Sequence, residues 1–283
     1  MTVAFIGLGI MGSRMAAHLL QGDAELRVYN RSPQAAEHLQ QQGAVVCKTV
    51  QQAVSGADIV FSMLSTPEVV EQVFFAEGLA AMRKGALWVD CTTVNPSFSR
   101  RAEKQAALAG IRFMDAPVAG SKPHAEKGEL VFFAGCREGE YDGLDGCFRL
   151  MGKKVVYLGT TGRGSALKML VNLLLAQAMV VFSETLALGE KLGLEKEFLL
   201  DVLPGLPVVA PFIAMKTDMI RKDEFGVQFP LQWMHKDLHL AAVTAYEVEH
   251  PLFLANLTKE IYAGAVQAGL GREDFAAVYR FLS

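Results

Sequence analysis

A glycine-rich loop follows the first apolar run of the chain. Its residues are Gly7, Leu8, Gly9, Ile10, Met11 and Gly12, in the pattern G-x-G-x-x-G, between a strand-like run at 3–6 and a helical pattern at 12–21. In such a loop the first glycine allows a tight turn, the second lets the backbone approach a pyrophosphate, and the third lets the helix pack on the sheet. Unpaired N–H groups at the helix start then face the phosphates. The loop predicts a dinucleotide site; the alternative is a glycine-rich turn without a ligand.

The tip of the second strand-like run, 26–29, bears on which dinucleotide is bound. NAD sites usually place Asp or Glu there, to bind the ribose 2′-hydroxyl. Here the run is followed by Asn30, Arg31 and Ser32, with no carboxylate. Arg31 can form charge-assisted hydrogen bonds to a 2′-phosphate, and Asn30 and Ser32 add neutral donors. The tip therefore favours NADP(H) over NAD(H); the alternative is a polar turn with Arg31 in solvent.

Lys168 lies in a strongly apolar helical pattern that runs from Ser165 to about Leu192, and Asn172 follows four residues later on the same face. A lysine in such a place either reaches solvent or lines a polar cavity. In a cavity, burial lowers a lysine pKa toward the working pH, which suits proton donation to a carbonyl oxygen as a hydride arrives. Both interpretations remain open from the residues alone.

The predicted secondary structure around these residues changes along the chain, from alternating strands and helices to helices alone. Strand-like runs lie at 3–6, 26–29, 45–47, 59–64 and 87–90, with further candidates at 112–116, 130–134 and 155–158, and helical patterns between them include 12–21, 34–42 and 69–75. Repeated strand–helix alternation predicts a doubly wound α/β domain. After the loop at 159–164 the pattern is helical, with an interruption at 204–211.

We therefore predict an α/β chain: a Rossmann-type doubly wound sheet over 1–161, then a long interdomain helix and an all-α C-terminal domain over 162–283. The active site is expected in the cleft between the domains, where ligand sites of this kind usually form.

Composition narrows the choice of partners. The chain has 283 residues, 51% of them hydrophobic and 20% charged, and its net charge of −3 gives no general attraction to nucleic acid or to an anionic membrane. Four scattered cysteines and six histidines show no metal-ligand spacing, so neither a metal nor a disulfide framework is expected. The apolar stretch 169–188 contains polar side chains and predicts a buried helix, not a membrane span. With no basic N-terminal leader, a cytoplasmic location is expected.

Three further motifs follow the glycine loop in order. They are Asp115-Ala-Pro-Val-Ala-Gly120-Ser121, Gly164-Ser-Ala-Leu-Lys168-Met-Leu-Val-Asn172, and Lys236-Asp237-Leu-His-Leu-Ala241. Together these motifs resemble the β-hydroxyacid dehydrogenase family, essentially from end to end. Most members carry Ser-Gly-Gly at 119–121, whereas this chain has Ala-Gly-Ser followed by Lys122. That variant and the segment 229–237 are similar to the glyoxylate and succinic semialdehyde reductase branch, whose preferred cofactor is NADPH.

The resemblance implies roles for the matching positions around the substrate. Lys168 would be the catalytic general acid and base, and Asn172 would help to orient the substrate. Ser121 would bind a carboxylate or carbonyl oxygen, although Gly120-Ser121 is also compatible with a plain tight turn. Thr93 would lie near both the nicotinamide ribose and the substrate.

Further positions follow from the same resemblance. Met63 and Leu64 would pack near the adenosine or its ribose, with ordinary core packing as the alternative. Lys236 would contact the cofactor and Asp237 would fix the surroundings of Lys168. Phe229 and Trp233 are candidates for the pocket wall, although Trp233 is also compatible with burial between subunits.

These expectations combine into one function with two alternatives. The chain is expected to reduce a small carboxylate-bearing aldehyde with NADPH, for example succinic semialdehyde to 4-hydroxybutyrate or glyoxylate to glycolate. The first alternative, an NAD-linked 3-hydroxyisobutyrate or tartronate semialdehyde dehydrogenase, is disfavoured by Arg31 and the 120–122 segment. The second, a non-catalytic NADP-binding module, is disfavoured by Lys168, which such relatives lose. The family also implies a homodimer or homotetramer.

Overall fold

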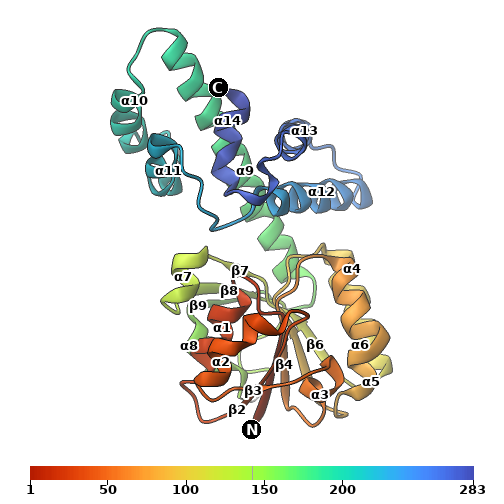
Figure 1. Ribbon diagram of the computed structural model, residues 1–283. Helices are drawn as coiled ribbons and strands as arrows, with labels where there is room; N and C mark the ends of the chain where they lie inside the picture. The colour runs from red at the N-terminus through yellow and green to blue at the C-terminus, as the bar shows by residue number, and fades with distance from the viewer. Residues whose placement is uncertain (142) are drawn as a thin grey trace. The chain divides into compact units, whose positions relative to one another are not determined.

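The computed structural model describes residues 1–141 and 143–283. The chain divides into two compact units, Met1–Lys168 and Met169–Ser283. The first contains the strands and the second is helical (Figure 1).

A six-stranded parallel sheet forms the centre of the first unit. Its strands, in spatial order, are β3 (Val45–Val46), β2 (Glu25–Tyr29), β1 (Thr2–Ile6), β4 (Ile59–Ser62), β5 (Leu87–Asp90) and β6 (Arg112–Asp115). The order reverses between β1 and β4. In open sheets of this kind, ligands bind outside the carboxyl ends of the strands at such a switch point. The predicted doubly wound sheet is confirmed, and its switch point lies at the end of β1, where the glycine-rich loop begins.

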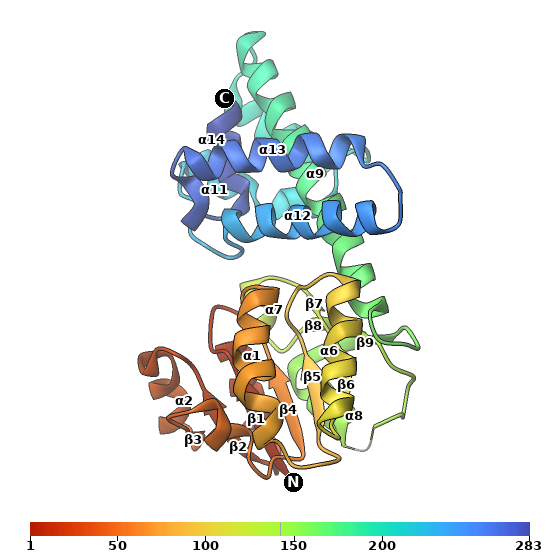
Figure 2. The same cartoon turned by 90° about the vertical axis from the view of Figure 1, so that its right-hand side faces the viewer.

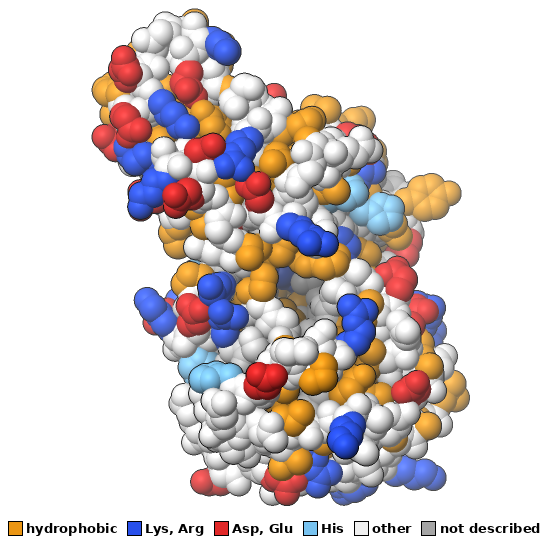
Figure 3. All heavy atoms as spheres, viewed as in Figure 1, with side chains coloured by type: hydrophobic (Ala, Val, Ile, Leu, Met, Phe, Trp, Pro, Cys, Tyr) orange, Lys and Arg blue, Asp and Glu red, His pale blue; other side chains and the backbone are white. Residues whose placement is uncertain are grey.

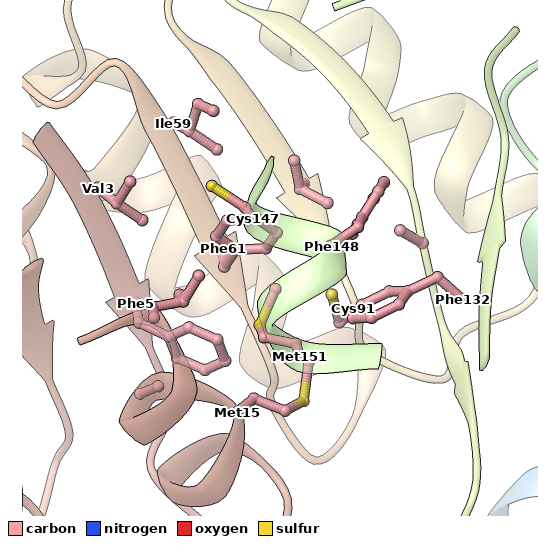
Figure 4. Close-up of a cluster of buried hydrophobic side chains, with 14 of the residues drawn as sticks. Val3, Phe5, Met15, Ile59, Phe61, Cys91, Phe132, Cys147, Phe148 and Met151 are labelled. Atoms are coloured by element: carbon pink, nitrogen blue, oxygen red, sulfur yellow. The ribbon is translucent and has the colours of Figure 1, made fainter. Parts of the chain in front are cut away.

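Helices cover both faces of this sheet, which is why its central strands are apolar on both sides. One face carries α1 (Gly12–Leu19), α2 (Glu37–Gln41) and α8 (Leu144–Met151), and the other carries α3 (Val50–Val54), α4 (Pro67–Val70), α5 (Leu79–Ala81) and α6 (Pro96–Leu108) (Figure 1). Figure 4 shows the core of the first face, where Phe61 lies between Phe5 and Phe148. On the other face Trp88 stacks on Phe74, with 4.1 Å between ring centroids.

The strands predicted at 130–134 and 155–158 belong to a second, smaller sheet. It consists of β7 (Val118–Ala119), β8 (Leu130–Ala134) and β9 (Gly152–Tyr157), with β7 antiparallel and β9 parallel to β8. A short helix, α7 (Lys122–Glu126), connects β7 to β8. The strands predicted at 130–134 and 155–158 therefore exist, but they pair with one another and not with the main sheet.

Local structure departs from the sequence pattern at several boundaries. The helix predicted at 34–42 is a 3-10 turn (Pro33–Ala36) followed by α2, and the strand predicted at 59–64 ends at Ser62. The helix predicted at 69–75 extends through α4, a π-helical segment (Glu71–Gly78) and α5. Apolar periodicity locates such elements but does not fix their ends, which depend on capping and tertiary contacts.

The second unit is built on the long helix α9 (Arg163–Lys191), whose first six residues belong to the first unit. This is the helix predicted for residues 165 to about 192. The other helices are α10 (Lys196–Val202), α11 (Thr217–Lys222), α12 (Leu231–Glu247), α13 (Phe253–Gln267) and α14 (Val278–Leu282). α12 and α13 lie side by side, joined by a short loop (Figure 2). Two 3-10 turns, Leu203–Gly205 and Pro211–Met215, occupy the predicted interruption.

The expectation that residues 169–188 form a buried helix is wrong for one face of α9. Met179 and Leu186 are fully buried in the core of the helical unit, but Leu174 and Leu188 are 73% and 61% exposed. The rest of the unit packs against one side of the helix only, and exposed hydrophobic side chains are visible over the helical unit (Figure 3). By length and composition α9 is also able to cross a membrane, a test that core helices pass as well.

Candidate functional site

The glycines of the loop after β1 have different surroundings. Gly7 has φ of 97°, and a Cβ there would overlap the carbonyl oxygen of Met63. A Cβ on Gly12 would overlap the carbonyl oxygen of Gly7, so the loop and α1 pack in direct contact. At Gly9, by contrast, nothing lies within 4 Å of an added Cβ. The close contacts explain the first and third glycines, and the open space at the second fits the approach of a pyrophosphate.

Backbone donors face this open space at the start of α1. Within the described part of the chain, the N–H groups of Ile10 and Met11 donate no hydrogen bond. Unpaired N–H groups at a helix start bind phosphate oxygens, and the helix dipole favours the anion. The loop therefore fits the phosphates of a dinucleotide.

Asn30, predicted as a cofactor donor, holds the loop itself. Its Oδ1 accepts a hydrogen bond from Leu8 N at 3.0 Å, and its Nδ2 donates to Ser32 O at 3.0 Å. The side chain thus ties the tip of β2 to the glycine loop. Arg31 and Ser32 are exposed beside it, and Arg31 forms no ion pair or hydrogen bond with any described residue.

The ends of β4 and β5 carry a buried polar network that the sequence did not reveal. Ser62 Oγ donates to Asp90 Oδ1 at 2.7 Å and accepts from Trp88 Nε1 at 2.8 Å. Thr92 N also donates to Asp90 Oδ1, at 3.1 Å, and Thr92 Oγ1 accepts from Leu64 N at 3.0 Å. Burial raises the pKa of Asp90 to about 6, and the hydrogen bonds from Thr92 and Ser62 oppose that shift.

This network borders three of the predicted cofactor residues and holds one of them, Leu64, by a hydrogen bond. Leu64 is held by Thr92, and Thr93 is the next residue along the chain. Met63 and Leu64 are half-buried and lie against Gly7, so they border the glycine loop as well as contributing to the core. Two polar residues at the ends of neighbouring buried strands, Ser62 and Asp90, were the available signal for this network.

Ser121 lies at the start of α7, after Gly120, whose φ is 117°. Its N–H and its hydroxyl both point to His124 Nδ1, at 3.3 and 3.4 Å. The sequence pattern does not single out His124, because its interaction with Ser121 forms only where the chain turns into α7. Ser121 is half-buried, so its hydroxyl remains within reach of a ligand.

The helix that begins at Ser121 docks against α1. Arg14 Nε donates to Glu126 Oε1 at 2.9 Å, and the His18 ring donates from Nε2 to the Ala125 carbonyl at 3.0 Å. These contacts place the predicted substrate residue on a helix packed against the one that begins at the glycine loop.

In the helical unit, three predicted residues meet. Asn172 Nδ2, on α9, donates to Asp237 Oδ2 at 2.6 Å, and Lys236 Nζ lies 2.9 Å from Asp237 Oδ1, on α12. Asn172 and Asp237 are each only 3% exposed. Because the amide nitrogen of Asn172 faces the carboxylate, the Asn172 Oδ1 atom is left buried without a hydrogen-bond partner among the described residues. Lys168 is half-buried and lies one helical turn before Asn172 on α9.

Phe229 lies in the segment just before α12 and Trp233 lies in the first turn of α12. Both side chains are half-buried. Asp274 Oδ2 accepts from Phe229 N at 3.0 Å, and Asp274 Oδ1 pairs with Lys216 Nζ at 2.8 Å. This ion pair is almost completely buried. It therefore holds the Phe229 segment in place, a long-range role that neither charged residue revealed in the sequence.

Comparison with known proteins identifies the family. Residues 2–159 match the model of the NAD-binding domain of 6-phosphogluconate dehydrogenase, and residues 162–282 match the model described as NAD-binding of NADP-dependent 3-hydroxyisobutyrate dehydrogenase. Glyoxylate/succinic semialdehyde reductase 1 of Arabidopsis thaliana is 32% identical, over 98% of this chain and 97% of its own length. The chain belongs to the β-hydroxyacid dehydrogenase family.

Two further proteins similar to this β-hydroxyacid dehydrogenase agree with that assignment. The chloroplastic glyoxylate/succinic semialdehyde reductase 2 of Arabidopsis thaliana is 32% identical, over 99% of this chain and 79% of its own length. The structure of 3-hydroxyisobutyrate dehydrogenase from Mycobacterium tuberculosis, with L-serine, superposes with a TM-score of 0.89 at 31% identity, covering 99% and 98% of the two chains. The chain is thus an oxidoreductase that acts on CH–OH groups and carries an NAD(P)-binding domain.

Proposed function

We propose that this β-hydroxyacid dehydrogenase uses NADPH to reduce a small carboxylate-bearing aldehyde, of the size of succinic semialdehyde or glyoxylate. The observation that carries the proposal is the buried Asn172–Asp237 pair, one turn after Lys168, with its unpaired amide oxygen. Buried polar atoms are nearly always hydrogen-bonded, so an unpaired one next to a candidate catalytic lysine calls for a ligand or a lysine ammonium as its partner. The two Arabidopsis relatives are named as reductases of such aldehydes.

The choice of NADPH rests on the tip of β2. Arg31 is exposed and has no partner in the described chain, and Asn30 and Ser32 leave the tip without a carboxylate. A guanidinium free to bind a 2′-phosphate favours NADPH. The pyrophosphate would be held by the N–H groups of Ile10 and Met11, over the open space at Gly9.

The bound coenzyme supplies a hydride to the aldehyde carbon. Lys168 Nζ donates a proton to the carbonyl oxygen as that oxygen gains charge, so aldehyde, hydride and proton together give the alcohol. Lys168 then recovers a proton from solvent. Ser121 offers its hydroxyl to the substrate carboxylate, while its N–H donates to His124 Nδ1. Asp237 holds Asn172 in the orientation that leaves the amide oxygen available.

Steady-state NADPH oxidation with a panel of short aldehydes tests the proposal. Lys168→Ala is expected to lower kcat by about 10²-fold or more, as removal of a general acid typically does. Lys191→Ala, which removes the same side chain from the other end of α9, is the matched control and should behave as the parent does. A Lys168→Ala protein as active as the parent would refute the assigned role.

Arg31→Ala is expected to weaken NADPH binding by about 10- to 100-fold, because charge-assisted hydrogen bonds contribute about 1.5–3 kcal/mol. NADH binding should hardly change, since NADH lacks the 2′-phosphate. Arg27→Ala removes an equal charge from β2 itself, four residues before Arg31, at an ion pair with Glu25, and controls for general electrostatics. Equal losses for both nucleotides would contradict the assignment of Arg31.

Two other functions make different predictions in the same assays. An NAD-linked 3-hydroxyisobutyrate or tartronate semialdehyde dehydrogenase would oxidise its hydroxy acid with NAD in preference to NADP. The Mycobacterium tuberculosis structure is named as a 3-hydroxyisobutyrate dehydrogenase, without a nucleotide. A non-catalytic module would bind NADPH but turn over no aldehyde, with or without Lys168.

We also propose that a second copy of the chain covers the exposed face of α9. Leu174, Val181 and Leu188 are each more than half exposed on that helix, and α13 adds Phe253 and Leu257. Exposed apolar surface of this extent is typical of subunit interfaces. A homodimer or homotetramer accounts for it.

A further inference from the structure

Asp115 is a fully buried carboxylate at the end of β6 for which the proposed chemistry has no use. Its Oδ1 accepts from Gly162 N at 2.8 Å, and its Oδ2 accepts from Ser165 N at 2.7 Å. Both N–H groups belong to the start of α9, which begins at Arg163. The first N–H groups of a helix have no partner within the helix, and a negative charge is favourable there. Asp115 therefore caps α9 from a strand 47 residues earlier in the chain.

The backbone around this carboxylate approaches so closely that only glycine fits. A Cβ on Gly135 would overlap Asp115 Oδ1, and a Cβ on Gly164 would overlap the carbonyl oxygen of Phe133 and approach Asp115 Oδ2 to 2.9 Å. Gly135 N also donates to the Asp115 carbonyl at 2.8 Å. The ends of β6 and β8 and the first turn of α9 are thus in direct contact.

A second anchor lies on the same turn. Ser99 Oγ, on α6, and Ser165 Oγ share a hydrogen bond of 2.8 Å, and both side chains are fully buried. The turn is therefore fixed on two sides, by the carboxylate from the sheet and by the hydroxyl from α6. Because its two oxygens accept from N–H groups three residues apart, those of Gly162 and Ser165, the carboxylate fixes the rotation of the helix as well as its position.

Burial raises the pKa of Asp115, and its hydrogen bonds from Gly162 and Ser165 oppose that effect. A buried charge costs desolvation free energy, which makes it a poor means of gaining stability alone. A hydroxyl or amide would cap one N–H at lower cost. The two-oxygen arrangement is therefore better explained by the geometry that it imposes.

Lys168 is three residues after Ser165, about 4.5 Å further along the helix axis, and is the last residue of the first compact unit. We infer that Asp115 is a positioning residue for Lys168: it fixes the first turn of α9 on the carboxyl edge of the sheet, so that the lysine is held in a set place relative to the glycine-rich loop. The inference rests on the proposed role of Lys168 as proton donor. It predicts that loss of the anchor affects proton transfer and leaves the coenzyme site intact.

The substitution Asp115→Asn tests the positioning role. The amide keeps one acceptor oxygen for one N–H of α9, but it places an NH2 group against the other N–H, so that hydrogen bond is lost. A displacement of the order of 1 Å at a reacting group lowers the rate by up to about 10²-fold. We expect kcat to fall by about tenfold or more, with the NADPH dissociation constant within about twofold of the parent's. Titration with NADPH gives the fraction of active sites, so kcat is corrected for any unfolded protein.

The deciding measurement is a double-mutant cycle with Lys168→Ala. If Asp115 acts through Lys168, Asp115→Asn should cause no further loss of kcat in the Lys168→Ala background, since residues that act as a unit are not additive. If the two losses multiply, Asp115 supports the fold or the coenzyme site instead, and the inference is overturned. Full activity of Lys168→Ala alone would show, separately, that the proposed function itself has failed.

Two further variants complete the experiment. Asp90 is the residue paired with Asp115 in the β5–β6 register, and its buried carboxylate bonds to Ser62 and Thr92 instead of to α9. The loss of kcat caused by Asp90→Asn should therefore multiply with the loss caused by Lys168→Ala. Ser99→Ala removes the hydrogen bond to Ser165, which is the weaker of the two contacts that fix the first turn of α9. It tests the same inference if the Asp115→Asn protein does not fold. It should lower kcat by about two- to fivefold, in line with the loss of one hydrogen bond, and only while Lys168 is present. A Ser99→Ala loss that persists without Lys168 would also overturn the inference.

Discussion

At the residue scale, the buried carboxylates Asp90 and Asp115 show how differently two similar groups are used. They are direct partners in the β5–β6 register, and burial raises the pKa of both. Asp115 uses its two oxygens on two helix N–H groups. Asp90 receives its hydrogen bonds on Oδ1, and its buried Oδ2 has no partner among the described residues. The ionisation of Asp90 therefore opposes folding, because its hydrogen bonds only partly offset the cost of burying the charge.

The pH dependence of the free energy of unfolding should reveal the raised pKa of Asp90. The pKa of Asp90 is about 6 in the folded protein against 3.8 for an ordinary aspartate, so the folded state binds the proton more tightly. Its contribution to the free energy of unfolding is present below about pH 4 and is lost as pH rises through about 6. Urea denaturation of the parent and of Asp90→Asn, compared from about pH 4 to about pH 7, should show the parent losing about 2 kcal/mol relative to the variant.

Ser62→Ala extends the same test. The Ser62 hydroxyl lowers the pKa of Asp90, so its removal should move the window of lost stability to higher pH. A difference between parent and Asp90→Asn that stays constant across the range would show that Asp90 keeps an ordinary pKa.

At the element scale, the glycines of the loop before α1 serve two different purposes: one is required by packing and another by ligand binding. Gly12 touches the Gly7 carbonyl, whereas Gly9 borders open space. A side chain is therefore excluded at residue 12 by the protein itself, and at residue 9 only by a ligand.

Alanine substitutions should show that contrast. Gly9→Ala is expected to leave the melting temperature within a few degrees of the parent's and to raise the NADPH dissociation constant by about tenfold or more, since the methyl group occupies the space of the pyrophosphate. Gly12→Ala should lower the melting temperature and weaken NADPH binding together, because α1 must move off the loop. Normal NADPH binding by Gly9→Ala would place the phosphates elsewhere.

The same scale shows which features the sequence could predict. The glycine loop and the main strands follow from patterns a few residues long, and the structure confirms the doubly wound sheet and the long helix. The Asp115 cap on α9 and the Lys216–Asp274 pair join residues 47 or more positions apart, and their residue types are common on surfaces. No local pattern distinguishes such residues before the fold brings them together. The pairing of β8 with β9 in a separate sheet is long-range information of the same kind.

At the scale of the whole molecule, the exposed face of α9 sets an expectation for assembly. Burial of a leucine or valine side chain contributes about 1.5–3 kcal/mol, so several such residues on one helix stabilise an interface substantially. Burial of this face in the proposed oligomer would account for a helix that has the composition of a core element but is exposed on one face in the single chain.

Charge on that face should disrupt the assembly. Leu174→Glu combined with Val181→Glu is expected to weaken subunit association by at least about tenfold, because each glutamate would be buried without a partner. Light scattering after size-exclusion chromatography measures the mass. Leu108→Glu is the control: Leu108 is 83% exposed, but it lies on α6 of the other unit. A parent that is monomeric at all concentrations would contradict the proposed oligomer.

The tether formed by Asn30 has a consequence for redesign of nucleotide preference. Exchanging the tip of β2 for an acidic residue is an obvious way to favour NADH. At residue 30, however, an aspartate could still accept from Leu8 N but could not donate to Ser32 O, so the turn would lose one of the two bonds that shape it. Residue 31, whose side chain supports nothing else among the described residues, can be exchanged without that penalty. Selectivity can therefore be engineered at residue 31 separately from the scaffold of the loop.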